Sequence, residues 1–321
     1  MNGAAAGSGC PGRAPRRGMK VAPMNILILG GEGMMGHKAF QVLSPRFETH
    51  ATFLEERGLW RTFPMYADGA RTHGGVNALE FETVEEIVRR IKPACVINCI
   101  GIIKQLEEAH DPILSISLNA LFPHRLARLC ASTGSRMIHL STDCVFSGKK
   151  GSYTEEDFSD ADDLYGRTKY LGEVAGPGCL TIRTSIFGRD FLKRSALLEW
   201  FLSNRGGKAR GYKNSIYTGF PTQVMARIMG DVIERHADLS GVYQVASAPI
   251  SKLELLVKIR DAMRLDVEIT PWEDPPCDRS LRADRFVAAT GYRIPEWDAM
   301  VRELADDSTP YDEWRKRHAT V

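Results

Sequence analysis

The chain has 321 residues, of which 43% are apolar and 26% charged, a composition typical of folded globular proteins. Its 42 basic and 40 acidic residues leave a formal charge of +2, so it lacks the strong positive field that binding of nucleic acid requires. No apolar run approaches the roughly 18 residues of a membrane-spanning helix. These properties predict a soluble, cytoplasmic protein with one large α/β domain and a smaller lobe.

The first 23 residues are rich in Ala, Gly, Pro and Arg and contain no apolar segment of a secretory signal. We therefore expect a disordered extension over 1–23 and folded structure from Met24. None of the seven cysteines forms a CxxC pair, and four lie in apolar runs, where cysteine behaves as a small hydrophobic residue. Reduced cysteines and no metal site are expected.

The first elements of the chain alternate between strands and helices. The apolar run 26–29 predicts a buried strand, followed by a glycine loop and a helix over 34–43. The alternation continues with strands expected at 49–53, 95–100, 136–140 and 180–183, and helices at 84–91, 113–130 and 164–174. This order is typical of a doubly wound parallel sheet.

Beyond residue 185 the alternation weakens. The elements expected there are helices at 197–202 and 221–235, a loop at 206–213, a strand at 242–246 that returns to the sheet, and, after Pro249, one helix, a proline-rich turn at 271–276 and a C-terminal helix. The predicted organisation is a dinucleotide-binding domain over 24–185, completed by the strand 241–247, and a substrate-binding lobe formed by 186–240 and 248–321.

Three glycines spaced three apart, Gly30, Gly33 and Gly36, lie between the first strand and the first helix. Without a Cβ, the backbone N–H groups and the helix N-terminus can approach a pyrophosphate closely. The loop therefore indicates a dinucleotide site, to which Met34 and Met35 of the first helical turn are expected to contribute. Glu32, within the loop, must point to solvent, or its carboxylate would weaken binding of the phosphate.

The end of the second strand distinguishes the two nicotinamide cofactors. An acidic residue there suits the ribose of NAD, and an arginine suits the 2′-phosphate of NADP. Glu55, Glu56 and Arg57 occupy this position, with Arg61 close by. The arginines favour NADP(H) slightly over NAD(H), and solvated loop charges are the alternative reading.

Tyr165 and Lys169 lie four residues apart, a spacing that places both side chains on one face of a helix. A nearby ammonium is expected to lower the tyrosine pKa from about 10, so that Tyr165 can protonate a ketone oxygen. Thr142 stands in a hydroxyl-rich stretch, 141–146, at the carboxyl end of a predicted strand, where open α/β sheets place their sites. Its hydroxyl can bind the same carbonyl.

Together these motifs resemble the extended short-chain dehydrogenases/reductases, and most closely the dTDP-4-dehydrorhamnose reductase group, over nearly all of the chain after Met24. The matching segments are Gly30-x-x-Gly33-x-x-Gly36, Val96-Ile97-Asn98-Cys99, Ser141-Thr142-Asp143-x-Val145-Phe146, Tyr153-x-Glu155-x-Asp157, Tyr165-Gly166-x-Thr168-Lys169-x-x-Gly172-Glu173 and Arg183-Thr184-Ser185. The resemblance implies a Rossmann fold with a C-terminal substrate lobe. It also implies NAD(P)H-dependent reduction of a keto group, at C4, on a nucleotide-linked deoxysugar, as in deoxysugar and polysaccharide biosynthesis.

The resemblance further implies the roles of individual residues. Thr142, Tyr165 and Lys169 would form the catalytic trio, with Lys169 also holding the nicotinamide ribose. The remaining cofactor contacts would come from Asn77, near the adenine, and from Asn98, Cys99 and Gly101. Substrate contacts are expected from Asp143, Cys144, Val145, Ser185, Lys213 and Arg279. Arg210 and Arg282 are further candidates for the pyrophosphate, and Tyr212, Tyr217 or Trp272 for stacking on the base.

Cys144 stands where the resembled group usually has tyrosine. In position it is similar to the cysteine of GDP-fucose synthases, which epimerise a sugar carbon before reduction. That chemistry needs a partner acid, usually histidine, and none occurs between His139 and His236. Cys144 is therefore interpreted as a wall of the pocket, with an epimerase as the alternative. Dehydration is disfavoured because Cys144 replaces the glutamate of the 4,6-dehydratases.

A non-catalytic reading also remains open. The regulatory subunit of methionine adenosyltransferase resembles the same reductase group, so a nucleotide-binding regulatory module is the second alternative. The intact Thr142, Tyr165 and Lys169 favour catalysis. A nucleotide-sugar is the expected partner in that case, and a homodimer is compatible with the sequence.

Overall fold

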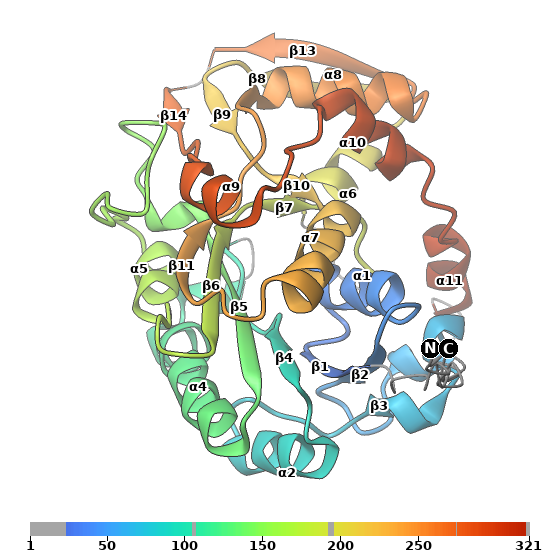
Figure 1. The fold of residues 1–321 in the computed structure, drawn as a ribbon. Helices are drawn as coiled ribbons and strands as arrows, with labels where there is room; N and C mark the ends of the chain where they lie inside the picture. Colours follow the sequence, from blue (N-terminus) through green and yellow to red (C-terminus); the bar gives the residue numbers. More distant parts are fainter. Residues whose placement is uncertain (1–23, 105–106, 192–195, 274, 319–321) are drawn as a thin grey trace, which may run out of the picture.

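The computed structural model describes residues 24–104, 107–191, 196–273 and 275–318, so the extension expected over 1–23 lies outside the described residues. Its centre is a sheet of seven parallel strands in the order β11-β6-β5-β4-β1-β2-β3 (Figure 1). These strands are β1 (Asn25–Leu29), β2 (Glu48–Thr52), β3 (Thr72–His73), β4 (Cys95–Asn98), β5 (Arg136–Thr142), β6 (Cys179–Thr184) and β11 (Gly241–Gln244). The predicted doubly wound parallel sheet is confirmed.

Helices cover both faces of this sheet (Figure 1). One face carries α1 (Met34–Leu43) and α7 (Thr222–Arg235), and the other carries α2 (Phe81–Ile91), α4 (Phe122–Thr133) and α5 (Leu164–Leu171). The run 26–29 is apolar throughout because Ile26 and Ile28 face the first layer and Leu27 and Leu29 the second.

The strand order reverses beside β1, which has β2 on one side and β4 on the other. In an open α/β sheet, ligands bind in the crevice beyond the carboxyl ends of the strands at such a point. Leu29 at the end of β1 pairs with Asn98 at the end of β4. The glycine loop and the segment after Asn98 therefore share this edge of the sheet.

The single helix predicted over 113–130 is instead three consecutive pieces: α3 (Pro112–Ser115), a π-helical segment η5 (Ile116–Leu121) and α4. Pro123, at the start of α4, has no N–H to donate to the carbonyl of Asn119, so the regular helical ladder is interrupted there. Gly172, at the end of α5, fills the space beside that carbonyl, since a Cβ on it would lie only 1.9 Å from the Asn119 oxygen.

The smaller lobe contains more regular structure than the sequence predicts. The loop expected at 206–213 is a strand, β8 (Gly207–Tyr212), paired in parallel with β13 (Val267–Trp272). Two helices were expected after Pro249, and that prediction is wrong, because the described residues there form α8 (Lys252–Ala262), α9 (Asp284–Thr290), α10 (Trp297–Ala305) and α11 (Tyr311–His318). Further elements of this part of the chain are β7 (Ile186–Phe187), α6 (Leu197–Leu202), β9 (Ser215–Tyr217), β10 (Phe220–Pro221), β12 (Ile250–Ser251) and β14 (Cys277–Asp278).

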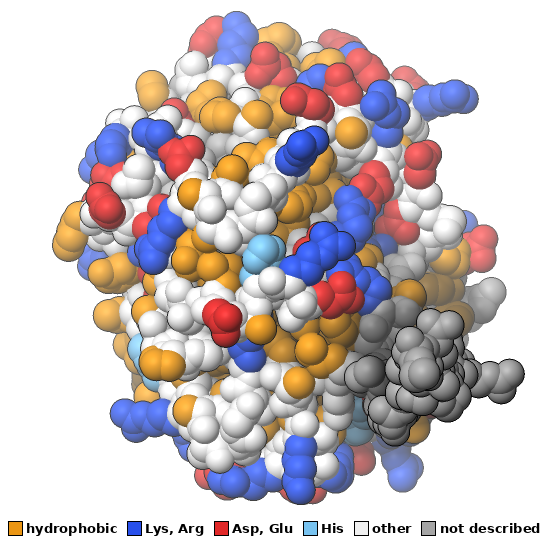
Figure 2. Space-filling view, viewed as in Figure 1, with side chains coloured by type: hydrophobic (Ala, Val, Ile, Leu, Met, Phe, Trp, Pro, Cys, Tyr) orange, Lys and Arg blue, Asp and Glu red, His pale blue; other side chains and the backbone are white. Residues whose placement is uncertain are grey.

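On the face shown in Figure 2, basic and acidic side chains of the described residues are interspersed, in keeping with the small net charge. Among the helices described, none combines the length and apolar character needed to cross a bilayer.

Candidate active site

The glycine loop joins β1 to α1 and is shaped by backbone contacts that only glycine permits. Gly30 has a φ of +86°, in the left-handed region, and a Cβ on Gly36 would lie 2.0 Å from the Gly30 oxygen. Among the described residues, a Cβ on Gly33 would meet only the Gly30 oxygen, at 3.6 Å, so the N-terminus of α1 is open to them, and none of their side chains caps it. This cradle of uncapped N–H groups fits a pyrophosphate.

The two methionines that follow the loop have different surroundings. Met35 is buried in the core against the sheet, and Met34 is half-buried. The side chain of Met35 therefore has no surface to offer a cofactor, because the helical period turns it toward β1. Only its backbone faces the helix N-terminus.

At the expected adenine end, Arg57 is exposed on the loop after β2. The amide of Asn77 is engaged locally, since its oxygen accepts the Leu79 N–H at 3.0 Å and its nitrogen donates to Glu80 at 3.1 Å. The structure thus uses Asn77 to form the turn before α2 and does not leave its amide free for a base.

Beyond β4, Asn98 is buried and both ends of its amide are bonded, to His139 at 3.1 Å and to the Ile100 N–H at 3.1 Å. It fixes the chain direction rather than offering a free amide. Cys99 is half-buried, and burial raises the pKa of its thiol to about 12. Gly101 is exposed beside Lys169, with the Lys169 Nζ 3.8 Å from the position of an added Cβ.

Asn119 is a residue that the sequence reading missed. From the π-helical segment η5, its side-chain oxygen accepts the Ile102 N–H at 2.9 Å and its nitrogen donates to the Ile102 carbonyl at 3.1 Å. Asn119 therefore anchors the segment after β4 to the π-helical segment η5. A buried asparagine within an apolar helical pattern was the available signal, and π-helical turns occur often at functional sites.

The three candidate catalytic residues come together at the carboxyl end of β5. Thr142 is its last residue, and its hydroxyl donates to the Asp143 carboxylate at 3.2 Å and lies close enough to Tyr165 of α5 to influence the pKa of that phenol. The Thr142 oxygen also accepts the Cys144 N–H at 3.1 Å, which holds the side chain in place. Lys169, one turn beyond Tyr165, donates from Nζ to the Leu140 carbonyl at 2.7 Å.

The charges of this group are set mainly by burial. Burial raises the pKa of Tyr165, and the Thr142 hydroxyl opposes that rise, so the net shift is opposite to the lowering expected from Lys169. Burial lowers the pKa of Lys169 to about 8, opposed by the carboxylate of Glu173. Unless a further cation is placed beside it, the Tyr165 phenol keeps its proton at neutral pH and can therefore donate it.

A buried ion pair supports α5 from below. Glu173 accepts two hydrogen bonds from Arg183 of β6, at 2.8 and 2.7 Å, and a third from the Ser141 hydroxyl at 2.7 Å. Both charged side chains are 5% exposed. The pair thus ties the end of the catalytic helix to two strands of the sheet.

Three of the candidate substrate contacts follow Thr142 directly. Asp143 is buried, which raises its pKa, while Arg279 of the smaller lobe lowers it. Burial raises the pKa of Cys144 to about 12, and Asp143 adds to that rise, so this thiol is neutral at physiological pH. Val145 lies fully buried in a small core with Phe146 and offers no side-chain surface to a substrate.

The structure brings Arg279 to this edge but leaves Lys213 elsewhere. Arg279 donates from Nε to the Phe146 carbonyl at 2.8 Å and interacts with Asp143 and Cys144. Lys213 lies on the outer β8–β13 sheet, where its exposed ammonium pairs with Glu273 at 2.6 Å. Only Arg279 of the two is therefore positioned beside the candidate active site.

The other lobe candidates are also dispersed. Arg210 stacks on Trp272, 4.1 Å from its ring, and Arg282 pairs with Asp284 on the surface. Tyr217 is buried, with its hydroxyl packed against Gly219 and the Ser185 carbonyl, so it is no open platform for a base. Ser185 itself is half-buried after β6, where its carbonyl accepts the Phe220 N–H at 2.9 Å.

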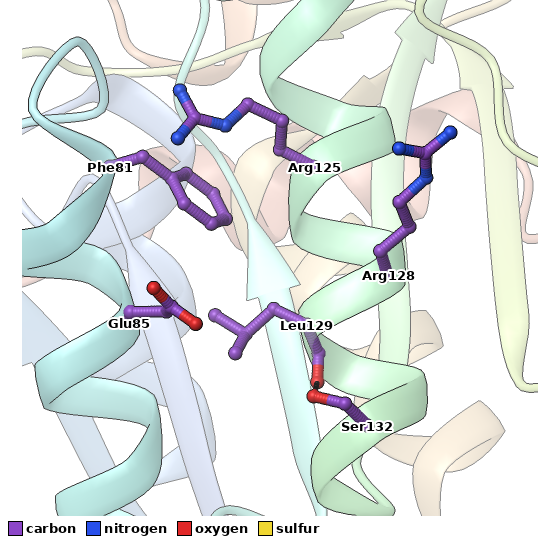
Figure 3. A pocket seen from close by; sticks show the side chains of 6 residues that line it. All are labelled: Phe81, Glu85, Arg125, Arg128, Leu129 and Ser132. Carbon is purple, nitrogen blue, oxygen red and sulfur yellow. Dashed lines mark hydrogen bonds between the residues drawn. The ribbon is translucent and has the colours of Figure 1, made fainter.

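A pocket on the outer helical layer lies apart from these residues (Figure 3). It is lined from α2 and α4 by Phe81, Glu85, Arg125, Arg128, Leu129 and Ser132. The Arg125 guanidinium lies 4.1 Å from the ring of Phe81 and covers it. None of the candidate site residues contributes to this pocket.

Comparison with known proteins agrees with the fold of the chain. A family described as the RmlD substrate binding domain matches residues 24–309. The methionine adenosyltransferase 2 subunit beta of Rattus norvegicus is 24% identical over 275 residues, covering 80% of this chain and 78% of that protein. The dTDP-4-dehydrorhamnose reductase of Streptomyces griseus is 31% identical over 150 residues, covering 46% of this chain and 43% of that protein.

Among solved structures, the dTDP-4-dehydrorhamnose reductase of Bacillus anthracis, in complex with NADP, superposes with a TM-score of 0.71 at 17% identity, covering 88% of this chain and 99% of that one. The resemblance to this group and the extended short-chain dehydrogenase/reductase fold are thereby confirmed.

Proposed function

The chain belongs to the RmlD substrate binding domain family, and from that premise we propose that it is an NAD(P)H-dependent reductase of a nucleotide-linked deoxysugar, acting on a keto group at C4. The observation that carries this proposal is the contact between Thr142 and Tyr165 at the edge of the sheet that also bears the glycine loop. A binding module without chemistry has no need of an acid and a second hydroxyl at that place.

The glycine loop, with Lys169 and Gly101, would hold the dinucleotide, because Gly33 leaves the N-terminus of α1 open and Gly36 lets α1 approach the Gly30 oxygen closely. When bound, the reduced nicotinamide supplies hydride. Tyr165 would donate its proton to the carbonyl oxygen as charge develops there, and burial favours the protonated phenol that this step requires. Thr142 would orient the same oxygen.

We propose NADP(H) as the preferred cofactor, on the strength of the exposed Arg57 after β2. The related Bacillus anthracis reductase is complexed with NADP. Titration of both reduced cofactors into the purified protein would test this preference, and tighter binding of NADH would overturn it.

The direct test of the function uses purified protein with NADPH and a 4-keto-6-deoxy nucleotide-sugar. Loss of the absorbance of the reduced cofactor, dependent on the keto-sugar, is expected. TDP-, UDP-, GDP- and CDP-linked sugars, compared by thermal shift, would identify the nucleotide, since a ligand of the native state raises its melting temperature. If none of these keto-sugars is reduced, the proposal fails.

A regulatory subunit is the second candidate, because the methionine adenosyltransferase 2 subunit beta is a relative matched over 80% of this chain and 78% of its own length. Its test is co-purification with a catalytic subunit in the absence of any ketoreductase activity. An epimerase that uses Cys144 is disfavoured, since a thiol with a pKa of about 12 is a poor base at neutral pH. The homodimer stays a prediction, which sedimentation analysis would test.

A further inference from the structure

Two carbonyls of the glycine loop accept hydrogen bonds from side chains outside the loop, Tyr66 on the segment after β2 and His37 on α1. The Tyr66 hydroxyl donates to the Gly31 oxygen at 2.7 Å, and Nδ1 of His37 contacts the Gly33 oxygen at 2.9 Å. Because a trans peptide is planar, its N–H points opposite to its C=O. Fixing these carbonyls therefore fixes the N–H groups of Glu32 and Met34 toward the opposite side of the loop.

His37 is held in turn by the last described helix. Its Nε2 lies 2.9 Å from the hydroxyl of Tyr311 in α11. The Gly33 oxygen can only accept, so Nδ1 carries the hydrogen, and Nε2 accepts from the Tyr311 hydroxyl. Burial lowers the pKa of His37 to about 3, so this neutral form persists throughout the physiological range.

The start of α11 is anchored to α1 by a buried ion pair. Lys38, the neighbour of His37, donates to Asp307 at 2.7 Å and is 3% exposed. Thr309 continues this contact by accepting a hydrogen bond from Gln41 at 2.8 Å. The segment before α11 is thus fixed along the first helix of the dinucleotide-binding domain (Figure 1).

Aromatic and ionic contacts complete the docking of α11. The ring of Phe191 packs against His37 and Tyr311, with centroids 4.2 and 5.2 Å away, and stacks on Phe63 at 4.2 Å. Arg189 joins the smaller lobe to Asp312 of α11 at 2.8 Å. The loop after β2, the segment after β7 and α11 therefore meet directly behind the glycine loop.

We propose that α11 is a positioning element for the cofactor: Tyr311, acting through His37, holds the glycine-loop N–H groups in the orientation that binds the pyrophosphate. The proposal rests on the proposed NAD(P)H-dependent function. The family match ends at residue 309, so Tyr311 lies outside the part of the chain that the family describes. Docking of the C-terminal segment and cofactor affinity are coupled through one hydrogen-bonded chain, from Tyr311 through His37 to Gly33.

The test is Tyr311→Phe, which removes one hydroxyl and keeps the ring. Loss of one buried hydrogen bond should weaken NADPH binding about two- to tenfold, while kcat at saturating cofactor and KM for the keto-sugar stay within about twofold. The control is Tyr292→Phe, which removes the hydroxyl of a half-buried tyrosine beside α7, away from the glycine loop, and should bind NADPH as the wild type does.

A second pair of variants separates positioning from packing. His37→Asn keeps a side-chain N–H that can reach the Gly33 oxygen, whereas His37→Leu keeps only bulk, so affinity for NADPH should fall less in His37→Asn. Equal losses in both variants would contradict a positioning role. Equal weakening by Tyr311→Phe and Tyr292→Phe would do so too, because it would indicate general destabilisation.

The third readout needs no cofactor. Hydrogen exchange of the peptide covering 30–36 should be faster in Tyr311→Phe than in the wild type or Tyr292→Phe. If wild-type protein binds neither NADPH nor NADH, the proposed function fails, and these exchange rates alone decide whether Tyr311 holds the loop. Unchanged exchange would then overturn the positioning role.

Discussion

The dinucleotide-binding half and the smaller lobe differ in how they bring candidate residues together. At the sheet, Gly30, Asn98 and Thr142 lie at the carboxyl ends of three different strands and reach one edge, because parallel strands end at the same side. In the lobe, Arg279 reaches that edge, whereas Lys213 lies on a separate two-stranded sheet. Candidate residues at the ends of parallel strands are therefore gathered in one place, whereas candidate residues on connecting segments are spread over the lobe.

This difference has a physical cause. All strands of the central sheet are paired in parallel within one sheet. The position of a residue along its strand therefore nearly determines where it lies relative to the common edge. The lobe is assembled from short sheets, β12-β9-β14 and β13-β8, each with its own register. Residue type alone cannot say which of these sheets faces the active site. The comparison predicts large effects from changes at the strand ends and graded effects in the lobe.

The largest effect is expected from Tyr165→Phe. Removing the proton donor should lower kcat about 10²- to 10⁴-fold, as loss of a general acid does. Binding of NADPH, measured by fluorescence titration, should stay close to wild type because the glycine loop is untouched. Normal turnover in this variant would show that the group of Thr142, Tyr165 and Lys169 is not the catalytic centre. The proposed difference between the two regions would then lose its main support.

The next largest effect is expected from Gly36→Ala. The new Cβ would lie 2.0 Å from the Gly30 oxygen, a backbone atom that cannot move without distorting the loop. Overpacking costs about 1–3 kcal/mol, so NADPH binding should weaken about 5- to 150-fold, with a lower melting temperature. Gly176→Ala is the control, since its Cβ would meet nothing within 4 Å. Equal binding by the two variants would show that the loop is not the cradle.

The sequence predicts the sheet and its edge well for the same reason that these variants should act strongly. Periodic apolar runs determine β1 and α1, and the glycine spacing places the loop between them. The contact of Thr142 with Tyr165 follows from one strand end and one helix start. Neither inference needs knowledge of distant contacts.

What the sequence did not predict depends on contacts across long stretches of chain. The break at Asn119 arises from a missing N–H at Pro123, and the role of Asn119 depends on Ile102, 17 residues away. Val145 stands in a matching motif, yet it packs into a core with Leu281. The link from His37 to Tyr311 joins residues 274 apart, which no local pattern reveals.

The pKa of Lys169 predicts how the reaction depends on pH. Burial lowers the pKa of this lysine to about 8, so its ammonium is lost as the pH rises above that value. If the charged form holds the cofactor, kcat/KM for NADPH should be flat below about pH 8 and fall about tenfold per unit above it. Lys169→Arg should move that limb to higher pH, because guanidinium stays protonated.

The lowered pKa of Lys169 also predicts how the free energy of unfolding changes with pH. Lys169 has a folded pKa of about 8 and an unfolded value near 10.5, so between these limits the unfolded chain binds more protons. The contribution of this group to the free energy of unfolding therefore rises with pH across that window, while activity falls. Chemical denaturation of wild type and Lys169→Met at pH 7 and pH 10 would measure the difference. A fall in both stability and activity would point to another titrating group.

The smallest effect is expected in the lobe from Lys213→Met, for which Arg279→Met is the matched comparison. Arg279 lies beside Asp143 and Cys144, so losing its charge should raise KM for the nucleotide-sugar about 10- to 100-fold, the range for a hydrogen bond to a charged group. Lys213 forms an exposed pair with Glu273, and such pairs contribute at most about 1 kcal/mol, so KM should change by less than about twofold. Steady-state kinetics at saturating NADPH would compare the two. A larger effect from Lys213→Met would mean that the outer β8–β13 sheet contributes to substrate binding, and that the two regions differ less than their positions indicate.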